Sequence, residues 1–476
     1  MKLFLKWAAR GLVALVALCA VSIGLAGLSV PFASMQRFDP GIDAPPLKRI
    51  VIERVDVLPM AGETPEILED RWVVIENGAV LGILNENPAP VADERRLDGE
   101  GRTLTPGLID MHVHVFDRTD LLLYLAHGVT TVRNMMGLEG MHLEWRAELE
   151  AGRYPGPTLY TASPTLNQND SAPFHKYVTS EEEARTSVRR YADAGYDLIK
   201  IYNGLDADIF HAIMDEAADL NIPVTGHLPR AVEFDDILGS GIHSIEHAEE
   251  IYAYPLNRLR EGHPSIDVVA GDVNASGVYV TPTLTAFHNL SMAAKDKDAF
   301  TGAVPRDYIN PVIAFFGDRM MADPLSREDP TGYIRAAKNM GLVTKALYET
   351  RAPLLLGSDT GPSLTVPGAA THDEILLLSN YGLSPYDIIY SGTARAARAL
   401  GRSNDLGMIG AGAKADLLIV EGNPLLDLST LREPVFVIKG GAVYDQATLA
   451  QMKRRARRNM SVYETVGRLL RHELIK

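Results

Sequence analysis

Short apolar runs and longer amphipathic stretches alternate along most of the chain. Their lengths and spacing divide the chain into segments with different hydrophobic patterns. Residues 49–103 carry short β-type runs separated by Gly and Asn turns, which predicts a small sheet. From residue 104 to about 405, buried apolar runs alternate with helical stretches, which is typical of β/α units around a parallel sheet. Short β-type runs return over 406–446, and we expect them to join the first set in one composite β-sandwich domain.

Eight buried strands can be placed in the alternating region, and eight strand–helix repeats are the number that closes a (β/α)8 TIM-like barrel. We expect them near residues 107–115, 129–135, 157–163, 197–202, 222–227, 243–247, 278–284 and 352–359. The spacing from Ser180 to Glu183 is that of a capping box and predicts the start of a helix. The long connection over 285–351 has a helical pattern, which predicts a barrel helix plus an insertion over the active face.

The two ends of the chain have patterns of their own. Lys2, Lys6 and Arg10 precede an apolar stretch of about 18 residues, near the length that spans a bilayer. We expect residues 1–34 to be a signal anchor, with a cleaved signal peptide as the alternative, and residues 35–48 to be a linker. The positive-inside rule then predicts a periplasmic or otherwise extracytoplasmic location, with the protein on the inner membrane if the segment is uncleaved.

The last segment, residues 447–476, predicts one basic helix. We expect it to be a solvated surface helix, and contact with anionic lipid is the weaker interpretation.

Composition narrows the function classes. The net charge is -15, which argues against a nucleic-acid partner because phosphates select a basic surface. The chain contains one cysteine, Cys19, so no intrachain disulfide can form. The hydrophobic fraction of 46% and the charged fraction of 22% are ordinary for a globular protein, and they predict that most of the chain folds.

The first predicted barrel strand ends in His112-Val113-His114. Strand alternation sends both imidazoles to the same side, and catalytic groups of such barrels lie at the carboxyl ends of the strands. Two imidazoles on one side of a strand can hold a metal ion. A single His-x-His is weak evidence, but the preceding Thr-Pro-Gly-Leu-Ile-Asp stretch makes the context more specific.

A lysine, Lys200, ends the fourth predicted strand amid apolar residues, where a buried cation is costly. One interpretation is a lysine paired with a buried carboxylate. The other is a lysine carbamylated by CO2, which converts the cation into a carboxylate-like bridge between two metal ions. Lysine suits this chemistry because its pKa falls readily on burial.

Three further strand ends carry metal-type side chains. The fifth strand ends in His227, the sixth in His247 and the eighth in Asp359. Each histidine alone is more often a satisfied core residue than a ligand, but two successive strands ending in histidine favour a site. A carboxylate at the end of an apolar strand needs a partner, for which a metal ion or its water is suited.

These residues resemble the pattern of the amidohydrolase superfamily: His-x-His, Lys, His, His and Asp on strands one, four, five, six and eight. The stretches 128–134 and 407–417 resemble its imidazolonepropionase-like and prolidase-like branch. The resemblance implies one metal ion on His112, His114 and Asp359, a second on His227 and His247, and carbamylated Lys200 between them. It also implies attack by a hydroxide bridging the metal ions, with Asp359 as the acid–base group. Zinc is the expected metal.

Substrate contacts are predicted less sharply, from polar residues near the same strand ends. The candidates are Arg133, Tyr202, Arg230, His288 and His372. Each could equally be a supporting or a surface residue. The Leu-Pro pair that follows His227 departs from the small or polar residues of the dipeptidase relatives, which puts binding of a dipeptide carboxylate in doubt.

The sequence therefore predicts a metal-dependent hydrolase of amides: a dipeptide, an N-acyl amino acid or a cyclic amide. The alternatives are a lactone, ester or phosphotriester hydrolase with the same binuclear site, and a non-catalytic, membrane-tethered binding protein. A mononuclear deaminase is disfavoured because it would not need Lys200. The expected partner is a small-molecule substrate, and homo-oligomerisation is left open.

Overall fold

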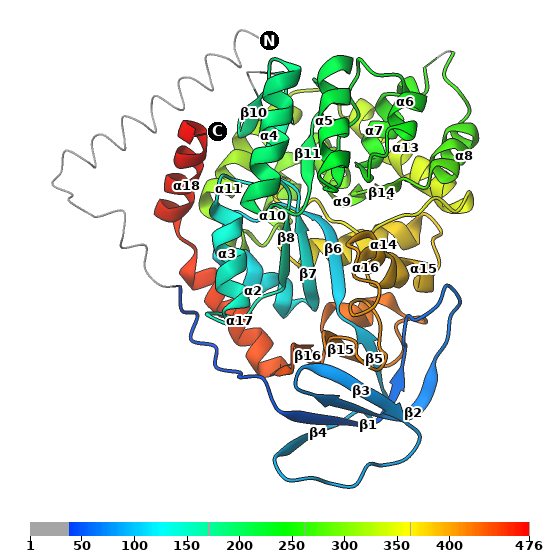
Figure 1. Cartoon of the computed structure of the whole chain (residues 1–476), viewed down its shortest axis with the longest axis vertical. Coiled ribbons are helices and arrows are strands. Elements are labelled where there is room, and N and C mark those ends of the chain that lie inside the picture. Colours follow the sequence, from blue (N-terminus) through cyan, green and yellow to red (C-terminus); the bar gives the residue numbers. More distant parts are fainter. Residues whose placement is uncertain (1–37, 170–171, 261, 362, 476) are drawn as a thin grey trace, which may run out of the picture.

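The computed structural model describes residues 38–169, 172–260, 262–361 and 363–475. Figure 1 shows a helix-rich body with a small sheet at one end, to which both early (blue) and late (orange) segments contribute. No helix among these described residues is long and apolar enough to cross a membrane. The predicted anchor or signal, residues 1–34, and the first part of the linker lie outside them.

The small domain is one eight-stranded sheet, whereas the sequence predicted a sandwich of two sheets. The sheet curls on itself: Ala79 bridges Lys414, and the backbone N of Ala415 donates to the carbonyl of Gly78. This curl encloses an apolar core that includes Ile52 and Leu417, so no second sheet is needed to cover it. The strands are β1 (Arg49–Val57), β2 (Leu68–Glu76), β3 (Ala79–Leu84), β4 (Glu94–Asp98), β5 (Arg102–Pro106), β15 (Leu417–Glu421), β16 (Phe436–Lys439) and β17 (Ala442–Asp445).

The early and late strands of this domain meet in one sheet where β5 pairs with β15. The strands are antiparallel, with Leu104 opposite Ile419 and Thr105 opposite Leu418. Because β5 runs on to Pro106, the small domain extends a few residues past the predicted boundary at 103.

Seven strands and one extended segment form a ring of parallel pairs in the positions that the apolar runs predicted. The strands are β6 (Leu108–Val113), β7 (Val129–Asn134), β8 (Thr158–Thr161), β11 (Ile199–Ile201), β12 (Val224–Gly226), β13 (Ser244–Glu246) and β14 (Tyr279–Thr281). The eighth segment is extended but joins only through single bridges. The bridges that complete the ring are Ala162 to Leu198, Val280 to Leu354 and Val113 to Thr360. Closure of this kind is that of a (β/α)8 barrel.

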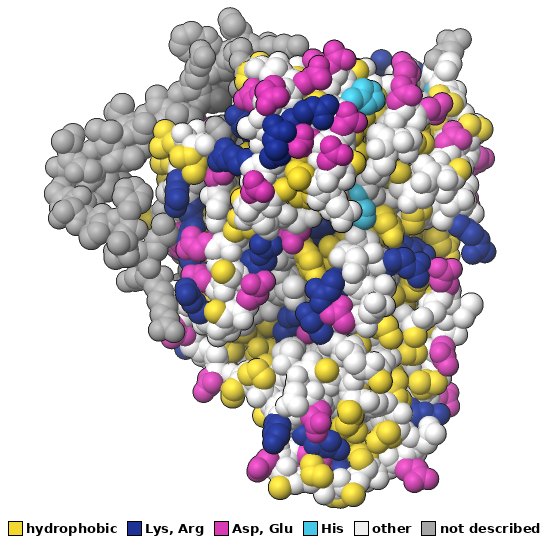
Figure 2. Space-filling view, in the orientation of Figure 1, with side chains coloured by type: hydrophobic (Ala, Val, Ile, Leu, Met, Phe, Trp, Pro, Cys, Tyr) yellow, Lys and Arg dark blue, Asp and Glu magenta, His cyan; other side chains and the backbone are white. Residues whose placement is uncertain are grey.

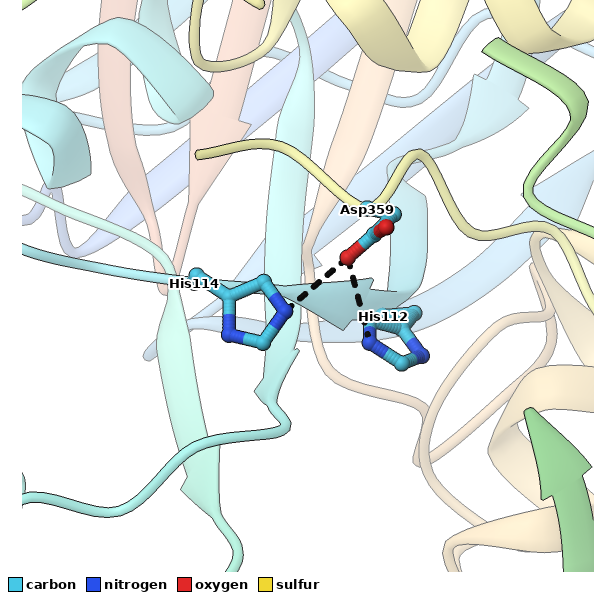
Figure 3. Close-up of side chains that lie close together, drawn as sticks. All are labelled: His112, His114 and Asp359. Atoms are coloured by element: carbon cyan, nitrogen blue, oxygen red, sulfur yellow. Dashed lines mark hydrogen bonds and ion pairs between the residues drawn. The ribbon is translucent and has the colours of Figure 1, made fainter. Parts of the chain in front are cut away.

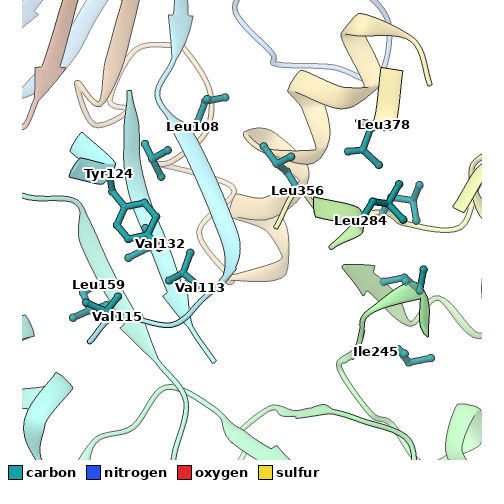
Figure 4. Packing of buried hydrophobic residues seen from close by; sticks show 14 of the residues in the cluster. Leu108, Val113, Val115, Tyr124, Val132, Leu159, Ile245, Leu284, Leu356 and Leu378 are labelled. Atoms are coloured by element: carbon teal, nitrogen blue, oxygen red, sulfur yellow. The ribbon is translucent and has the colours of Figure 1, made fainter. Parts of the chain in front are cut away.

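Apolar side chains between the strands and the surrounding helices form the main core. Figure 4 shows Leu108, Val132 and Leu356 from the barrel near Tyr124 and Leu378 from the helices. All five side chains are buried. Each apolar side chain buried in this way contributes roughly 1.5–3 kcal/mol, which holds the strand ends in place.

Helices follow most of the barrel strands. They are α2 (Arg118–Ala126), α3 (Met141–Glu150), α4 (Glu181–Ala194), α5 (Ala207–Asp219), α6 (Phe234–Gly239), α7 (Ala248–Ala253), η1 (Asn257–Leu259), α8 (Ile266–Ser276), α14 (Ala369–Asn380), α15 (Pro385–Ser391), α16 (Ala394–Ala399) and η4 (Leu428–Arg432). Ser180 caps α4 by accepting from the backbone N of Glu183. The Glu183 carboxylate accepts from the backbone N of Thr179 instead of Ser180, so half of the predicted capping box forms.

Two additions lie beside the barrel. Strands β9 (Thr165–Asn167) and β10 (His175–Tyr177) extend the sheet next to β11. The insertion over 285–351 is helical, as predicted, and Asn310 within it donates to Asp117 in the loop after β6. Its elements are α9 (Leu284–Lys295), α10 (Lys297–Ala303), η2 (Arg306–Tyr308), α11 (Pro311–Phe316), η3 (Gly317–Ala322), α12 (Asp323–Leu325) and α13 (Pro330–Glu349).

The C-terminal segment forms two helices, not the single solvated helix that was predicted. They are α17 (Gln446–Asn459) and α18 (Val462–Ile475). Helix α17 packs on α2 and buries Leu449 and Met452. Helix α18 buries Leu469 and His472, so both helices are part of the folded body.

The surface is mixed in charge on the face that Figure 2 shows. Acidic and basic side chains are interspersed there with apolar ones, without a continuous basic tract on that face. This view agrees with the acidic balance of the whole chain.

Candidate metal centre

The residues predicted as metal ligands all come from the carboxyl ends of barrel strands. His112 and His114 lie at the end of β6 and Lys200 lies within β11. His227 directly follows β12 and His247 directly follows β13. Asp359 ends the eighth extended segment, where its backbone N donates to the carbonyl of His112.

Three of these side chains form a compact group that could hold a metal ion: His112, His114 and Asp359. Oδ1 of Asp359 lies 2.9 Å from Nε2 of His114 and 3.4 Å from Nε2 of His112 (Figure 3). Burial alone would raise the pKa of Asp359, but the nearby histidines outweigh it and hold the pKa well below its usual range. The carboxylate is therefore charged and directed at both rings.

The second pair of histidines lies beside the first. The ring centroids of His227 and His247 are 4.7 Å apart, and those of His247 and His112 are 4.6 Å apart. Nδ1 of His247 is 4.0 Å from Oδ2 of Asp359. The structure thus brings together the histidines and the aspartate that were predicted from separate strands.

Lys200 completes the group. Its side chain is 3% exposed, and its Nζ has no hydrogen-bond partner among the described residues. Burial lowers the pKa of Lys200 to about 8, opposed by the charges of Glu246 and Asp359. An amine buried without a partner is costly, which makes this position a candidate for binding a further group.

Carboxylates and hydroxyls beneath the ligands fix their orientation. Nδ1 of His112 donates to Oε2 of Glu246 at 2.7 Å. Arg133 and Thr225 both donate to Oε1 of the same carboxylate, at 2.7 and 2.6 Å. Burial alone would raise the pKa of Glu246, but Arg133 and His112 hold it well below its usual range.

The other two rings are fixed in the same way. Nδ1 of His227 donates to Oε1 of Glu250 at 2.8 Å, and Nδ1 of His247 shares a hydrogen bond of 2.7 Å with the hydroxyl of Thr283. Engagement of Nδ1 on each ring leaves Nε2 as the nitrogen available to a metal ion. His112 is likewise held through its Nδ1. Its Nε2 is buried without a hydrogen-bond partner among the described residues. This donor set and its orphaned atoms fit divalent metal ions.

The backbone at two of the predicted ligands is strained. His247 has φ 78° and Asp359 has φ 49°, both in the left-handed region. Such conformations cost about 1–3 kcal/mol each and are concentrated at functional sites. Surrounding contacts therefore hold these two ligands in place against a local cost.

The geometry agrees with comparisons of sequence and structure. The model of the amidohydrolase family matches residues 103–446. The chain belongs to the amidohydrolase family. Within this amidohydrolase family, the chain is similar to the imidazolonepropionase of Geobacillus kaustophilus, at 23% identity over 413 residues, which cover 79% of this chain and 90% of that protein.

Solved amidohydrolase structures share the fold. A Xaa-Pro dipeptidase with methionine bound in its active site superposes with a TM-score of 0.67 at 19% identity, covering 83% of this chain and 100% of that chain. A bottromycin amidohydrolase superposes with a TM-score of 0.70 at 24% identity, covering 91% and 94%. These superpositions show the fold. The family match and the imidazolonepropionase relative agree with the branch that the motifs predicted, and the chain is a hydrolase of carbon–nitrogen bonds by family.

The predicted substrate contacts of this amidohydrolase fall in different places. The Tyr202 ring lies over the His227 ring, with centroids 4.0 Å apart. Arg230 pairs with Glu250 at 2.8 Å and is partly exposed. Both therefore border the metal centre, and their contact with substrate stays a prediction.

The other three candidates are placed less favourably for substrate contact. Arg133 is 1% exposed and its guanidinium is taken up by Glu246, so it supports ligands from beneath. His372 is buried against His127, donating from Nε2 to its carbonyl. His288 lies exposed on α9, where partial desolvation lowers its pKa and Asp373 opposes the shift.

The sequence analysis did not identify the acidic residues that support the histidine rings. Glu246 precedes the ligand His247 in the chain, and Glu250 follows it by three residues. A second group that could hold a metal ion consists of His227, Glu249 and Glu250. Because Glu250 already accepts from Nδ1 of His227 and from the backbone N of Leu228, we interpret this group as the support of the His227 ring. The one signal in the sequence is the position of these glutamates, directly before the predicted ligand His247 and three residues after it.

Proposed function

We propose that this protein hydrolyses an amide bond of a small molecule with two divalent metal ions, zinc being the expected metal. The observation that carries the proposal is Lys200, buried and without a hydrogen-bond partner among the described residues, beside four histidines and an aspartate. A single metal ion on His112, His114 and Asp359 would leave Lys200 without a role. With two ions, each side chain of the group would have a role, either as a ligand or as the bridge between the ions.

The proposed ligands divide between the two ions by position. His112, His114 and Asp359 would hold one ion, and His227 and His247 would hold the other. Lys200 would lie between the two sets as its carbamate. Imidazole and carboxylate donors of this kind suit zinc, and manganese or cobalt could substitute.

Carbamylation of Lys200 follows from its burial. The neutral amine would attack the carbon of CO2, so that a C–N bond forms while one C–O π bond breaks and its electrons move to oxygen. The adduct then loses one of its N–H protons to solvent. The lowered pKa of about 8 increases the share of neutral amine available at neutral pH. The product is an anion that suits two adjacent cations better than a lysine ammonium does.

When bound, the metal ions supply the Lewis acidity that activates a water molecule and polarises the scissile carbonyl. Asp359 would accept the proton of that water and return it to the leaving nitrogen, as one group acting in two steps. Its carboxylate is charged across the neutral range, and His114 and His112 fix its position. Glu246 and Glu250 hold the His112 and His227 rings through Nδ1, so that Nε2 would be the nitrogen that binds a metal ion.

Dipeptides are the first substrates to test. A structural neighbour is a Xaa-Pro dipeptidase with methionine in its active site, and another is a prolidase in complex with N-methylphosphonate-L-proline. In this chain Tyr202 and Arg230 border the metal centre, and they would contact the part of the substrate beyond the scissile bond. N-acyl amino acids and cyclic amides form the second group to test.

The test uses full-length protein loaded with zinc and bicarbonate against a panel of dipeptides, N-acyl amino acids, cyclic amides, lactones and esters. We expect turnover of at least one amide, with about two zinc ions per chain. Lys200→Ala should lose turnover by at least about 1,000-fold, whereas Lys345→Ala on the exposed face of α13 should not. Turnover of lactones or esters alone would refute the proposal, and so would full activity in Lys200→Ala.

The extracytoplasmic location is likewise a proposal, and it is supported only by the basic and apolar pattern of residues 1–34. Fractionation of cells that express the full-length protein tests it. Recovery in the soluble cytoplasmic fraction would refute it.

A further inference from the structure

The C-terminal helix α18 contacts the segment around Phe174, just before β10. Nε2 of His472 donates to the carbonyl of Phe174 at 3.0 Å, and Oε1 of Glu473 accepts from the backbone N of Phe174 at 2.7 Å. Both backbone groups of Phe174 are thus engaged by two consecutive residues of α18. Nδ1 of His472 also accepts from the backbone N of Glu139 at 3.0 Å, which joins the contact to the start of α3.

The residue held in this way has an unfavourable backbone conformation. Phe174 has φ 63°, in the left-handed region, although it carries a large side chain. A non-glycine residue keeps such a conformation only where its surroundings enforce it. The bonds from His472 and Glu473 supply that constraint at the residue itself.

The next residue along the chain, His175, is linked to the candidate metal centre through ring contacts. The His175 ring contacts the Tyr202 ring, with centroids 4.7 Å apart, and the Tyr202 ring contacts that of His227, with centroids 4.0 Å apart. Nδ2 of Asn167 donates to Nδ1 of His175 at 3.1 Å, across the β9–β10 pair. A row of rings therefore runs from the Phe174 turn to a proposed metal ligand.

Helix α18 is itself firmly attached. The Arg468 side chain donates to Glu144 at 3.0 Å and to Glu464 at 2.9 Å, and its guanidinium lies over the Trp145 ring. Thr465 and Leu469 are buried on the same face. The helix is therefore a fixed support and not a fraying end.

We propose that α18 is a positioning element for substrate binding, in which His472 and Glu473 set the Phe174 turn so that His175 and Tyr202 form one wall of the active site. The match to the family ends at residue 446, and α17 and α18 follow it. The wall therefore depends on residues beyond those that the family model matches. This inference rests on the proposed function, because it assigns the wall to the substrate of that site.

The kinetic test compares Glu473→Ala and His472→Ala with the unaltered full-length protein, using the amide that the panel identifies. We expect KM to rise about tenfold with kcat within about twofold, because ground-state positioning is lost while the metal chemistry is kept. Zinc content should be unchanged. Glu473→Gln should retain the original KM, since its amide oxygen can still accept from Phe174, and Leu474→Ala is the matched control because that side chain is 83% exposed.

Thermal melts separate this role from a purely structural one. A variant that melts earlier but keeps its KM would overturn the proposal, as would an equal loss in Glu473→Gln and Glu473→Ala. If His472→Ala fails to fold, the single Glu473→Ala variant decides.

A second measurement needs no substrate. Hydrogen–deuterium exchange should be faster at residues 174–177 in Glu473→Ala than in the unaltered protein, with no change at β12. If the panel gives no turnover at all, the proposed function fails, and unchanged exchange at 174–177 would then refute the positioning role separately.

Discussion

Nδ1 of His112 lies 2.7 Å from Oε2 of Glu246, although β6 and β13 are not neighbours in the barrel. The contact therefore crosses the barrel interior. Arg133 from β7 reaches the other oxygen of the same carboxylate. The buried Glu246 carboxylate thus links His112, a proposed metal ligand, to Arg133. The Arg133 guanidinium is also buried, and its positive charge balances that of the carboxylate.

Replacing Glu246 by glutamine should weaken metal binding. The amide keeps the shape of the carboxylate but leaves the Arg133 cation without its counter-charge. We expect metal affinity to fall about 10–100-fold and the free energy of unfolding to fall by about 3–5 kcal/mol. Competitive chelator titration and urea unfolding measure the two effects. The control is Glu100→Gln in a surface ion pair with Arg54, which should change stability by no more than about 0.5 kcal/mol.

Labelled bicarbonate should reveal the carbamate on Lys200. Protein refolded with zinc and 13C-bicarbonate should give a carbamate carbonyl resonance that is absent from Lys200→Ala. Refolding without CO2 should leave about one metal ion per chain in place of about two. Two ions bound without CO2 would contradict the bridging role.

Gly226→Ala should disrupt the junction between Lys200 and His227. Gly226 has φ +148°, and an added Cβ would lie 2.1 Å from the carbonyl oxygen of Ile201. Strand β12 would then move away from β11 beside both ligands. We expect a loss of at least about 2 kcal/mol in stability, with reduced metal content. Gly239→Ala is the matched control, because its added Cβ meets nothing within 4 Å.

Asp120→Asn should remove a pH dependence of stability. Burial, with Asp117 beside it, raises the pKa of Asp120 to about 8, whereas the unfolded value is about 4. The folded state therefore holds a proton that the unfolded chain has released, so stability is greatest below pH 4 and falls as pH rises towards 8.

The asparagine oxygen can still accept from the backbone N of Phe116 and Asp117, as Oδ2 of Asp120 does. We expect the variant to exceed the unaltered protein at pH 8 by at least about 1.4 kcal/mol, and the advantage to vanish near pH 4. Unfolding curves measured at both pH values check this, and parallel pH profiles would contradict it.

The barrel and its ligands were predictable because each depends on a local pattern. Apolar runs mark the strands, and a polar residue that ends such a run lies at the active end of a parallel barrel. His227 and His247 were found by that rule alone. The eighth segment was found in the same way, although it pairs only through single bridges.

The rest depends on contacts between distant parts of the chain. The same rule made Arg133 a substrate candidate, because a strand end does not tell whether a side chain faces the rim or lies beneath it. Glu246 and Glu250 gain their roles only once β13 lies beside β12 and across from β6. The C-terminal segment forms two helices, α17 and α18, and α18 contacts Phe174. Both features depend on packing against segments that are distant in the sequence.

The pairing of β5 with β15 sets an order in time for the folding of this protein. During synthesis, residues 102–106 leave the ribosome long before residues 417–421, so one edge of β5 has no partner until the whole barrel has been made. Contacts that join distant segments form slowly, and an unpaired strand edge favours aggregation. A nascent chain that stops within the barrel should therefore need chaperone protection at this edge until the last strands arrive.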